Sequence, residues 1–226
     1  TGAGTVNNMH SSTAATLVVG LHHADSTFAG LIANGAAGTM ALQKAGEGVL
    51  TLAPTSAANT ATGGITVTRG SVLLDHSVST LTSLWSSTGT ITLRSGGLAW
   101  KANPSTQIAA TLGALTVDAG PNFLTVNPNG ATSLQTVTLG AVTATAVGGT
   151  LLVTSPDNTA VLLGTAYSSS TTVAQARLIF TKDGSSYDYL ENAGATTASQ
   201  ALQVYSSSEL ATTNSSNDAL TRLHAG

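Results

Sequence analysis

The sequence predicts an all-β protein built as a parallel β-helix, a β-solenoid of short coils punctuated by glycines. Short runs rich in Val, Leu, Ile and Thr alternate in polarity, and most begin after a glycine. Four of their starts, at 48, 70, 89 and 113, are roughly 20 residues apart, which indicates an internal repeat. Only 8% of the 226 residues are charged, whereas an ordinary soluble domain carries about 25%.

The predicted strands follow one another without a clear helix between them. They are 48–52, 64–67, 70–74, 89–93, 113–117, 123–126, 134–139, 149–153 and 160–163. A glycine before a run supplies a positive φ or lets another backbone approach closely, as the corner of a coil requires. Each coil is expected to contribute two or three strands, and around ten coils stacked about 4.8 Å apart would form a rod of about 50 Å. The best helical candidates, 174–179 and 198–202, are short.

The low charge fits a stack of coils. Residues in equivalent positions lie above one another in such a stack, so like charges would repel, whereas Thr, Val, Ile and Leu pack well in ladders. An antiparallel sandwich or barrel is the alternative fold, because it also shows strands at short intervals. The turn dipeptides Asn34-Gly35, Asn129-Gly130 and Asp183-Gly184 favour that alternative.

Composition excludes several classes of protein. Seven Lys and Arg against ten Asp and Glu give a net charge of −3, and seven scattered cations cannot form the basic patch of a nucleic-acid binder. A hydrophobic fraction of 42% is too high for a charge-repelled disordered chain. The absence of Cys excludes disulfides and Cys-based metal sites. The apolar runs are far shorter than the about 18 residues that a membrane-spanning helix needs.

One ordered series of motifs is similar to a known family. TFAGLI at 27–32 leads into GTMALQKAGEGVLTL at 38–52, then ANTATGGITV at 58–67 and GSVLL at 70–74. This series resembles the autotransporter passenger-associated β-strand repeat, whose pattern is F-x-G-x-I … L-x-K-x-G-x-G-x-L-T-L-x-G-x-N-x-Y-x-G-G-T-x-V-x-x-G-x-L. Pro54, Ala61 and Ile65 depart from it. The resemblance covers about 13–75 and, more loosely, 89–164. It implies a right-handed parallel β-helix of a secreted or cell-surface bacterial protein.

Composition and motif content divide the chain into three parts. Residues 1–12 are expected to form a lead-in coil or an extended arm, and residues 13–164 one continuous solenoid. Residues 165–226 contain all four Tyr and two Ser runs. Because the last coil of a solenoid would expose an open sheet edge, this tail is predicted to form irregular final coils, a cap or a junction between subunits.

Aromatic side chains are the candidates for glycan or partner contact. Trp85 and Trp100 are about one coil apart and could stack on sugar rings, with burial as gap fillers as the alternative for both. Tyr187 and Tyr189 in the tail complete this set of candidates.

Acids and histidines form no marked catalytic or metal-binding pattern. Asp75, Asp118 and Asp157 are about 40 residues apart, and with Arg69 and Arg94 they are the set a polysaccharide-degrading enzyme would use, but structural placement at coil corners is the favoured interpretation. His22, His23 and Asp25, with His10 upstream, are the densest group of ligand types. Adjacent His residues on a strand point to opposite faces, so surface loops are the expected location. Asp75-His76 is an acid–imidazole pair without a nucleophile motif.

These observations predict a structural role. We expect a building block of an extracellular bacterial filament, surface layer or passenger stalk, which acts through coil stacking and self-association by end-to-end contacts. No enzyme activity, cofactor, metal, nucleic acid partner or membrane span is expected. An adhesin or glycan-binding module that contacts a glycan or host surface, and a polysaccharide-degrading enzyme, are the alternatives.

Overall fold

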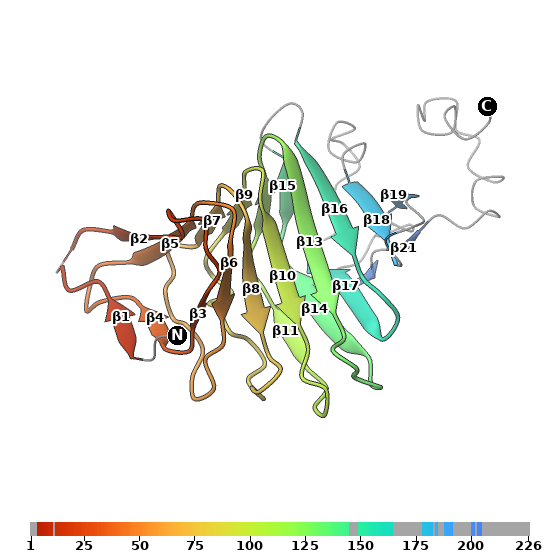
Figure 1. Cartoon of the computed structure of the whole chain (residues 1–226), viewed down its shortest axis with the longest axis horizontal. Helices are drawn as coiled ribbons and strands as arrows, with labels where there is room; N and C mark the ends of the chain where they lie inside the picture. The colour runs from red at the N-terminus through yellow and green to blue at the C-terminus, as the bar shows by residue number, and fades with distance from the viewer. Residues whose placement is uncertain are drawn as a thin grey trace.

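The computed structural model describes residues 4–10, 12–144, 149–164, 178–182, 184, 188–191, 200–201 and 203–204. This part of the chain is all-β, contains no helix, and forms a β-solenoid of about six turns (Figure 1). The predicted fold class is confirmed. The antiparallel sandwich is wrong, because the strands that make up the turns, β1 to β18, pair with one another only in parallel within the described residues.

The turns have three sides, each formed by one group of strands. The six-stranded sheet has the order β15 (Val142–Ala144), β12 (Leu115–Val117), β9 (Ile91–Leu93), β7 (Ile65–Val67), β5 (Met40–Lys44), β2 (Ala15–Val19). The nine-stranded sheet has the order β21 (Gln203–Val204), β19 (Asp188–Glu191), β18 (Leu178–Thr181), β16 (Thr150–Thr154), β13 (Pro121–Asn127), β10 (Gly97–Lys101), β8 (Ser71–Asp75), β6 (Val49–Leu52), β3 (Ser26–Phe28).

The third side is interrupted. It begins as the pair β1 (Thr5–Asn7) and β4 (Leu31–Ala33), and it ends as the four-stranded sheet β11 (Ala109–Thr111), β14 (Gln135–Leu139), β17 (Thr159–Leu163), β20 (Gln200–Ala201). Between β4 and β11, isolated backbone bonds such as that from the Thr60 N–H to the Ile32 carbonyl, together with the buried side chain of Asn59, take the place of strand pairing. The Asn59 Oδ1 accepts the Ile32 N–H at 2.6 Å, and its Nδ2 donates to the Leu84 carbonyl at 2.7 Å, so one side chain links three successive turns.

The period of the solenoid is longer and less regular than the sequence suggested. Val49 pairs with Ser71 of the next turn and Pro121 with Thr150, whereas Gln135 pairs with Thr159, so the number of residues in a turn varies along the chain. The expected even spacing of about 20 is therefore wrong, and the described part forms about six turns where around ten coils were expected. The starts at 48 and 70 precede strands of the nine-stranded sheet, whereas those at 89 and 113 precede strands of the six-stranded sheet. Both sheets use the same pattern of a glycine followed by aliphatic residues. The predicted period of about 20 therefore combined distances between strands that belong to two different sheets.

The core is a set of aliphatic ladders inside the coil. Ile65, Ile91 and Leu115 are in register on the six-stranded sheet and are buried. On the outer face of the same strands, Thr66, Thr92, Thr116 and Thr143 form a ladder in register. Alternating residues of a strand point to opposite faces, so one pattern builds both ladders. The abundance of Thr in the sequence follows from this stacking.

Glycines permit the tight contact between turns. Gly64 has φ +86°, and a Cβ there would strike the carbonyl of Thr90 in the next turn. Gly113 has an ordinary φ, but a Cβ at that position would strike the Gly89 carbonyl. The expected roles of glycine, positive φ and close backbone approach, are therefore divided between different corners.

The two ends of the chain differ from the middle. Residues 5–7 form β1 and pair in parallel with β4 of the following turn. At the other end, β18 continues the parallel stack on β16, but β19 pairs antiparallel with β18, β20 with β17, and β21 with β19. Residues 178–179 and 200–201, in the two expected helical segments, are strand, and residues 174–177, 198–199 and 202 lie outside the described part.

Candidate functional site

The charged residues gather at two corners of the solenoid. The first corner comprises the turns that lead from the six-stranded to the nine-stranded sheet. There Glu47 Oε1 contacts Arg69 Nη1 at 3.1 Å, and Arg94 Nε contacts Asp118 Oδ2 at 2.6 Å. Each ion pair joins successive turns. Opposite charges therefore stack across the turns at this corner, which is how a ladder architecture accommodates charge.

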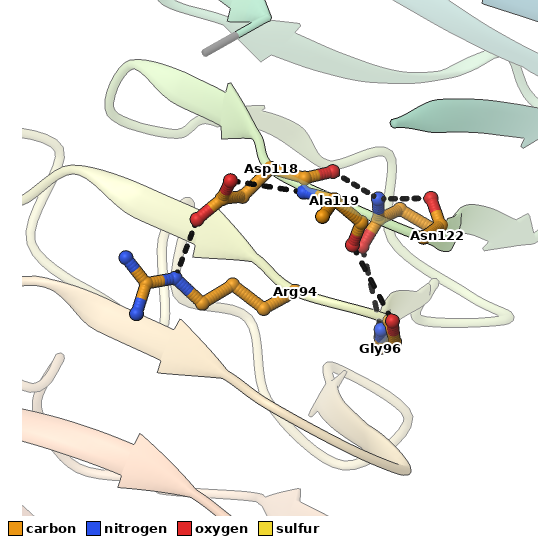
Figure 2. A network of polar contacts seen from close by, with 7 residues as sticks. Arg94, Gly96, Asp118, Ala119 and Asn122 are labelled. Carbon is orange, nitrogen blue, oxygen red and sulfur yellow. Dashed lines mark hydrogen bonds and ion pairs between the residues drawn. The ribbon is translucent and has the colours of Figure 1, made fainter. Parts of the chain in front are cut away.

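Asp118 is the most strongly held acid of the first corner. Figure 2 shows its carboxylate between the Arg94 guanidinium and the Ala119 backbone N–H, which donates to Oδ1 at 2.9 Å. The buried Asn122 side chain donates to the Asp118 carbonyl at 3.0 Å, and its Oδ1 accepts the N–H of Gly96 from the preceding turn at 3.3 Å. All these contacts fix the shape of a corner, and a carboxylate so engaged is suited to a structural role.

The second corner, after the strands of the nine-stranded sheet, holds the other two candidate acids. Asp75 contacts Lys101 of the next turn at 3.5 Å, and Asp157 contacts Lys182 at 3.4 Å. Asp118 lies at the first corner, so the three acids do not meet in one place. Uncharged asparagines also link successive turns at this corner. The side chains of Asn103, Asn129 and Asn158 donate to backbone carbonyls one turn back. Their acceptors are Ser79, Ala102 and Ala131.

Two histidines of the amino-terminal region and Asp25 accept backbone hydrogen bonds at the corners of the coil. His23 Nδ1 accepts the Glu47 N–H at 3.3 Å, and Asp25 Oδ1 accepts the Val49 N–H at 2.7 Å. His10 Nδ1 accepts the Thr13 N–H at 3.0 Å. Within the described residues, no three His, Cys, Asp or Glu side chains lie together where they could hold a metal ion.

Lys44 is a fully buried cation beneath the first corner. Its Nζ donates to the carbonyls of Ala45 at 2.7 Å and Gly46 at 2.6 Å. Burial lowers the pKa of Lys44, and the nearby Asp25 carboxylate opposes that shift. Gly20 closes the corner above it with φ +86°, where a Cβ would approach the ammonium group to 3.0 Å. Two main-chain acceptors thus satisfy a charge for which the aliphatic ladder offers no partner.

The two tryptophans lie in the core, as their alternative interpretation predicted. Trp85 and Trp100 are 1% and 0% exposed, so sugar rings have no access to either indole in this fold. Trp100 points inward because β10, a strand that the sequence analysis missed, alternates from Leu98 to Trp100 after Gly97. That alternation was the available signal. Tyr187 lies outside the described residues, and of Tyr189 the structure describes only its place in β19, opposite Ile179.

His76 packs beside Trp100, with ring centroids 5.1 Å apart. Its ring is fully buried, and Nδ1 lies 3.0 Å from the Leu81 carbonyl, which makes Nδ1 the protonated nitrogen. Burial lowers the pKa of His76 to about 4, against the smaller opposing effects of the Leu81 carbonyl and Asp75. The imidazole is therefore a neutral core group.

The first turn of the described part borders an apolar cavity. Here β2 and β3 are the last strands of their sheets, at the end of the stack that also carries β1 (Figure 1). An open cavity of about 290 Å³ lies between them and is lined mainly by apolar side chains, among them Val6, Leu17, Val19, Phe28 and Ile32. Sequence reasoning missed it, because the same alternation marks a strand inside the stack and a strand at its end.

The carboxy-terminal end is built differently. The nine-stranded sheet ends in β19 and β21, and the four-stranded sheet ends in β20, all of them antiparallel to their neighbours. β20 and β21 have two residues each. At this end of the described part, two of the three sides thus change from parallel to antiparallel pairing.

Comparison of the chain with protein-family models, with curated proteins and with solved structures finds no match. In the part of the chain that the structure describes, no helix has the length and apolar character needed to cross a bilayer.

Proposed function

We propose that this chain is a structural module, a stretch of β-solenoid in an extracellular bacterial filament, surface layer or passenger stalk that works by stacking and self-association. The observation that carries the proposal is the stack of about six turns, in which parallel ladders and one aliphatic core run through the described coils. Each turn of such a stack presents strand edges and apolar surface to the next, and the same kinds of contact can join one molecule to another.

The described turns support a mechanical role. Each turn is bonded to its neighbours by parallel backbone ladders, by asparagine side chains and by ion pairs one turn apart. Such a rod resists bending and gives a protease few loose segments, since its backbone groups are paired and its core is continuous. The candidate acids serve this scaffold as well, and the two tryptophans proposed for glycan contact lie in the core.

The bacterial surface location rests on the resemblance of residues 13–75 to the autotransporter passenger-associated repeat. The low charge is consistent with an assembling rod, because the ends of two weakly charged molecules repel each other little.

The proposal is tested by the mass and shape of the purified full chain. Light scattering coupled to size exclusion, over a wide range of protein concentration, should show species heavier than a single chain that increase with concentration. Electron microscopy of the same fractions should show rods joined at their ends. A monomer at every concentration, with no contact between rod ends, contradicts self-association.

A further inference from the structure

We propose that the turn Asn129-Gly130, at the second corner of the coil, is a site of spontaneous deamidation at which Asn129 is converted to isoaspartate and aspartate. The turn follows β13 and leads toward β14. No enzyme is needed, because the reactants are the Asn129 amide, the Gly130 N–H and water. The consequence is the chemical loss of one of the links between turns.

An asparagine followed by glycine has the groups that this reaction requires, and glycine has no side chain to hinder the attack. The Gly130 nitrogen loses its proton to solvent hydroxide and attacks Cγ of Asn129. The Cγ–Nδ2 bond breaks, Nδ2 takes a proton from water and leaves as ammonia, and a succinimide ring remains. Water then opens the ring, which gives aspartate when the Cγ–N bond is cleaved and isoaspartate when the bond to the main-chain carbonyl is cleaved. The net change is one water consumed and one ammonia released, without oxidation or reduction.

The geometry of this turn leaves room for the attack. Two adjacent residues have the left-handed backbone conformation, Asn129 with φ +53° and Gly130 with φ +78°. The Ala131 N–H donates to the Pro128 carbonyl at 2.9 Å, which closes a type I′ turn. Gly130 is exposed, and a Cβ there would meet no atom within 4 Å. The peptide between the two central residues therefore has the free space that it needs to rotate when the ring closes.

The dipeptide Asn34-Gly35 has the same sequence but is held in place. Asn34 Oδ1 accepts two backbone N–H groups, the nearer at 2.8 Å. The Gly35 N–H donates to the Gly38 carbonyl at 3.0 Å, and a Cβ on Gly35 would strike the backbone of Asn8. Both the attacking nitrogen and the amide under attack are thus fixed by their contacts, so we expect Asn34 to react much more slowly than Asn129.

Deamidation at this position removes a link between turns. Of the three asparagines whose side chains donate one turn back at the second corner, only Asn129 is followed by glycine. Its Nδ2 donates to the Ala102 carbonyl at 3.0 Å. The product has a carboxylate in place of the amide, and a carboxylate has no proton to donate to a carbonyl. Isoaspartate also lengthens the main chain by one carbon atom, next to Asn127, whose carbonyl accepts the Ala102 N–H.

Ageing of the folded full chain at mildly alkaline pH tests the proposal. Peptide mapping by mass spectrometry measures the gain in mass at each asparagine, and chromatography separates the isoaspartate product from the aspartate product. Asn129 should react at least about tenfold faster than Asn34. The neighbouring Asn127 does not confuse the assignment, because it precedes a proline, which has no N–H to attack.

Two controls separate the sequence from the structure. In concentrated urea both asparagines should react at similar rates, because the two dipeptides are identical and the contacts of the folded chain are gone. Gly130→Ala should slow the reaction of Asn129 about tenfold, in urea as well as in the folded chain, since a methyl group hinders the attack. The measurement in urea keeps this control valid even where alanine strains the turn. The aged protein should also unfold at a lower urea concentration than fresh protein, with unaged Asn129→Asp between the two.

Three results would contradict the proposal. Equal rates at Asn34 and Asn129 in the folded chain would mean that the contacts around the two turns do not control the reaction. An Asn129 that stays intact in the folded chain, while the chain in urea reacts, would mean that the turn does not admit the attack. An aged protein that contains isoaspartate at position 129 and unfolds as fresh protein does would show that the link to Ala102 contributes nothing to the stack.

Discussion

The first turn and the middle turns of the solenoid are made from the same kinds of residues, but they are buried to different degrees. In the middle turns Leu74 and Trp100 are fully buried, because a turn on either side covers them. In the first turn Leu17 and Phe28 occupy equivalent inward positions and remain partly exposed. A coil of a solenoid is thus stabilised mainly by its neighbours, and its own sequence supplies only a surface that can be covered.

The largest effect is expected from removing a core aromatic in the middle turns. Trp100→Ala should lower the free energy of unfolding by about 3–5 kcal/mol, since a large cavity would be left between two turns that cannot collapse. Phe28→Ala in the first turn should cost about half as much. Urea unfolding followed by circular dichroism measures both. Equal losses at the two positions would contradict the contrast between the turns.

Acid is expected to destabilise the middle turns through His76. Its pKa is about 4 in the folded protein and about 6.5 in an unfolded chain, so only the unfolded chain takes up a proton between these values. The free energy of unfolding should therefore fall as the pH is lowered from about 6.5 to about 4, by up to about 3 kcal/mol. Below pH 4 this group should contribute no further loss.

The variant His76→Phe isolates the histidine from the carboxylates. It should be less stable at pH 7, because the bond to the Leu81 carbonyl is lost, but its stability should change less between pH 6.5 and 4. An unchanged pH dependence in this variant would mean that His76 is not the group that titrates.

Asn59→Ala tests the side of the middle turns that lacks strands. It should cost about 2 kcal/mol, since the buried Ile32 N–H loses its acceptor. Gln107→Ala is the control, because its exposed amide donates a single bond to the Leu134 carbonyl, 2.8 Å away, and about 0.5 kcal/mol is expected. Thermal melts of both proteins at one pH give the comparison. A loss for Asn59→Ala no greater than that of the control would show that the side chain does not replace strand pairing.

The smallest effect is expected at the corner ion pairs. Because the Arg94 side chain is largely exposed, a double-mutant cycle with Arg94→Met and Asp118→Asn should give a coupling of less than about 1 kcal/mol. That coupling should shrink further in 1 M salt, when the free energies of unfolding are remeasured in urea. A coupling of several kcal/mol, insensitive to salt, would give these charges a larger role than the stacking of the core.

Much of the fold could be predicted from short-range patterns. Runs such as 64–67 and 70–74 show the alternation of a half-buried strand, and the glycines before them mark corners. The three-residue strand Ala109–Thr111 has too few residues to show a period and was missed, whereas the predicted runs 134–139 and 160–163 belong to the same side. The length of a turn was underestimated, because loops of different lengths lie between equivalent strands and similar runs serve two sheets.

The candidate site was less predictable than the fold. The sequence contains Arg94 and Asp118, but not the fact that one turn of the coil brings the first beneath the second. Nor does the local sequence around Trp100 show whether its side chain is buried in the core or exposed on the outer face of the coil. Pairing over one turn is set jointly by strand register and corner length, and both emerge only when the turns are stacked.

By itself, the sequence determined that the chain is all-β, coiled and sparsely charged, because alternation, glycine corners and ladder-compatible side chains are local properties. Only the tertiary structure decided which charges pair across turns and which aromatic rings are enclosed. The physical reason is that burial in a solenoid is supplied by the adjacent turn. A residue such as Ile65 belongs to the core because Leu42 and Ile91 of the adjacent turns lie in register with it, and both are distant from it in the chain.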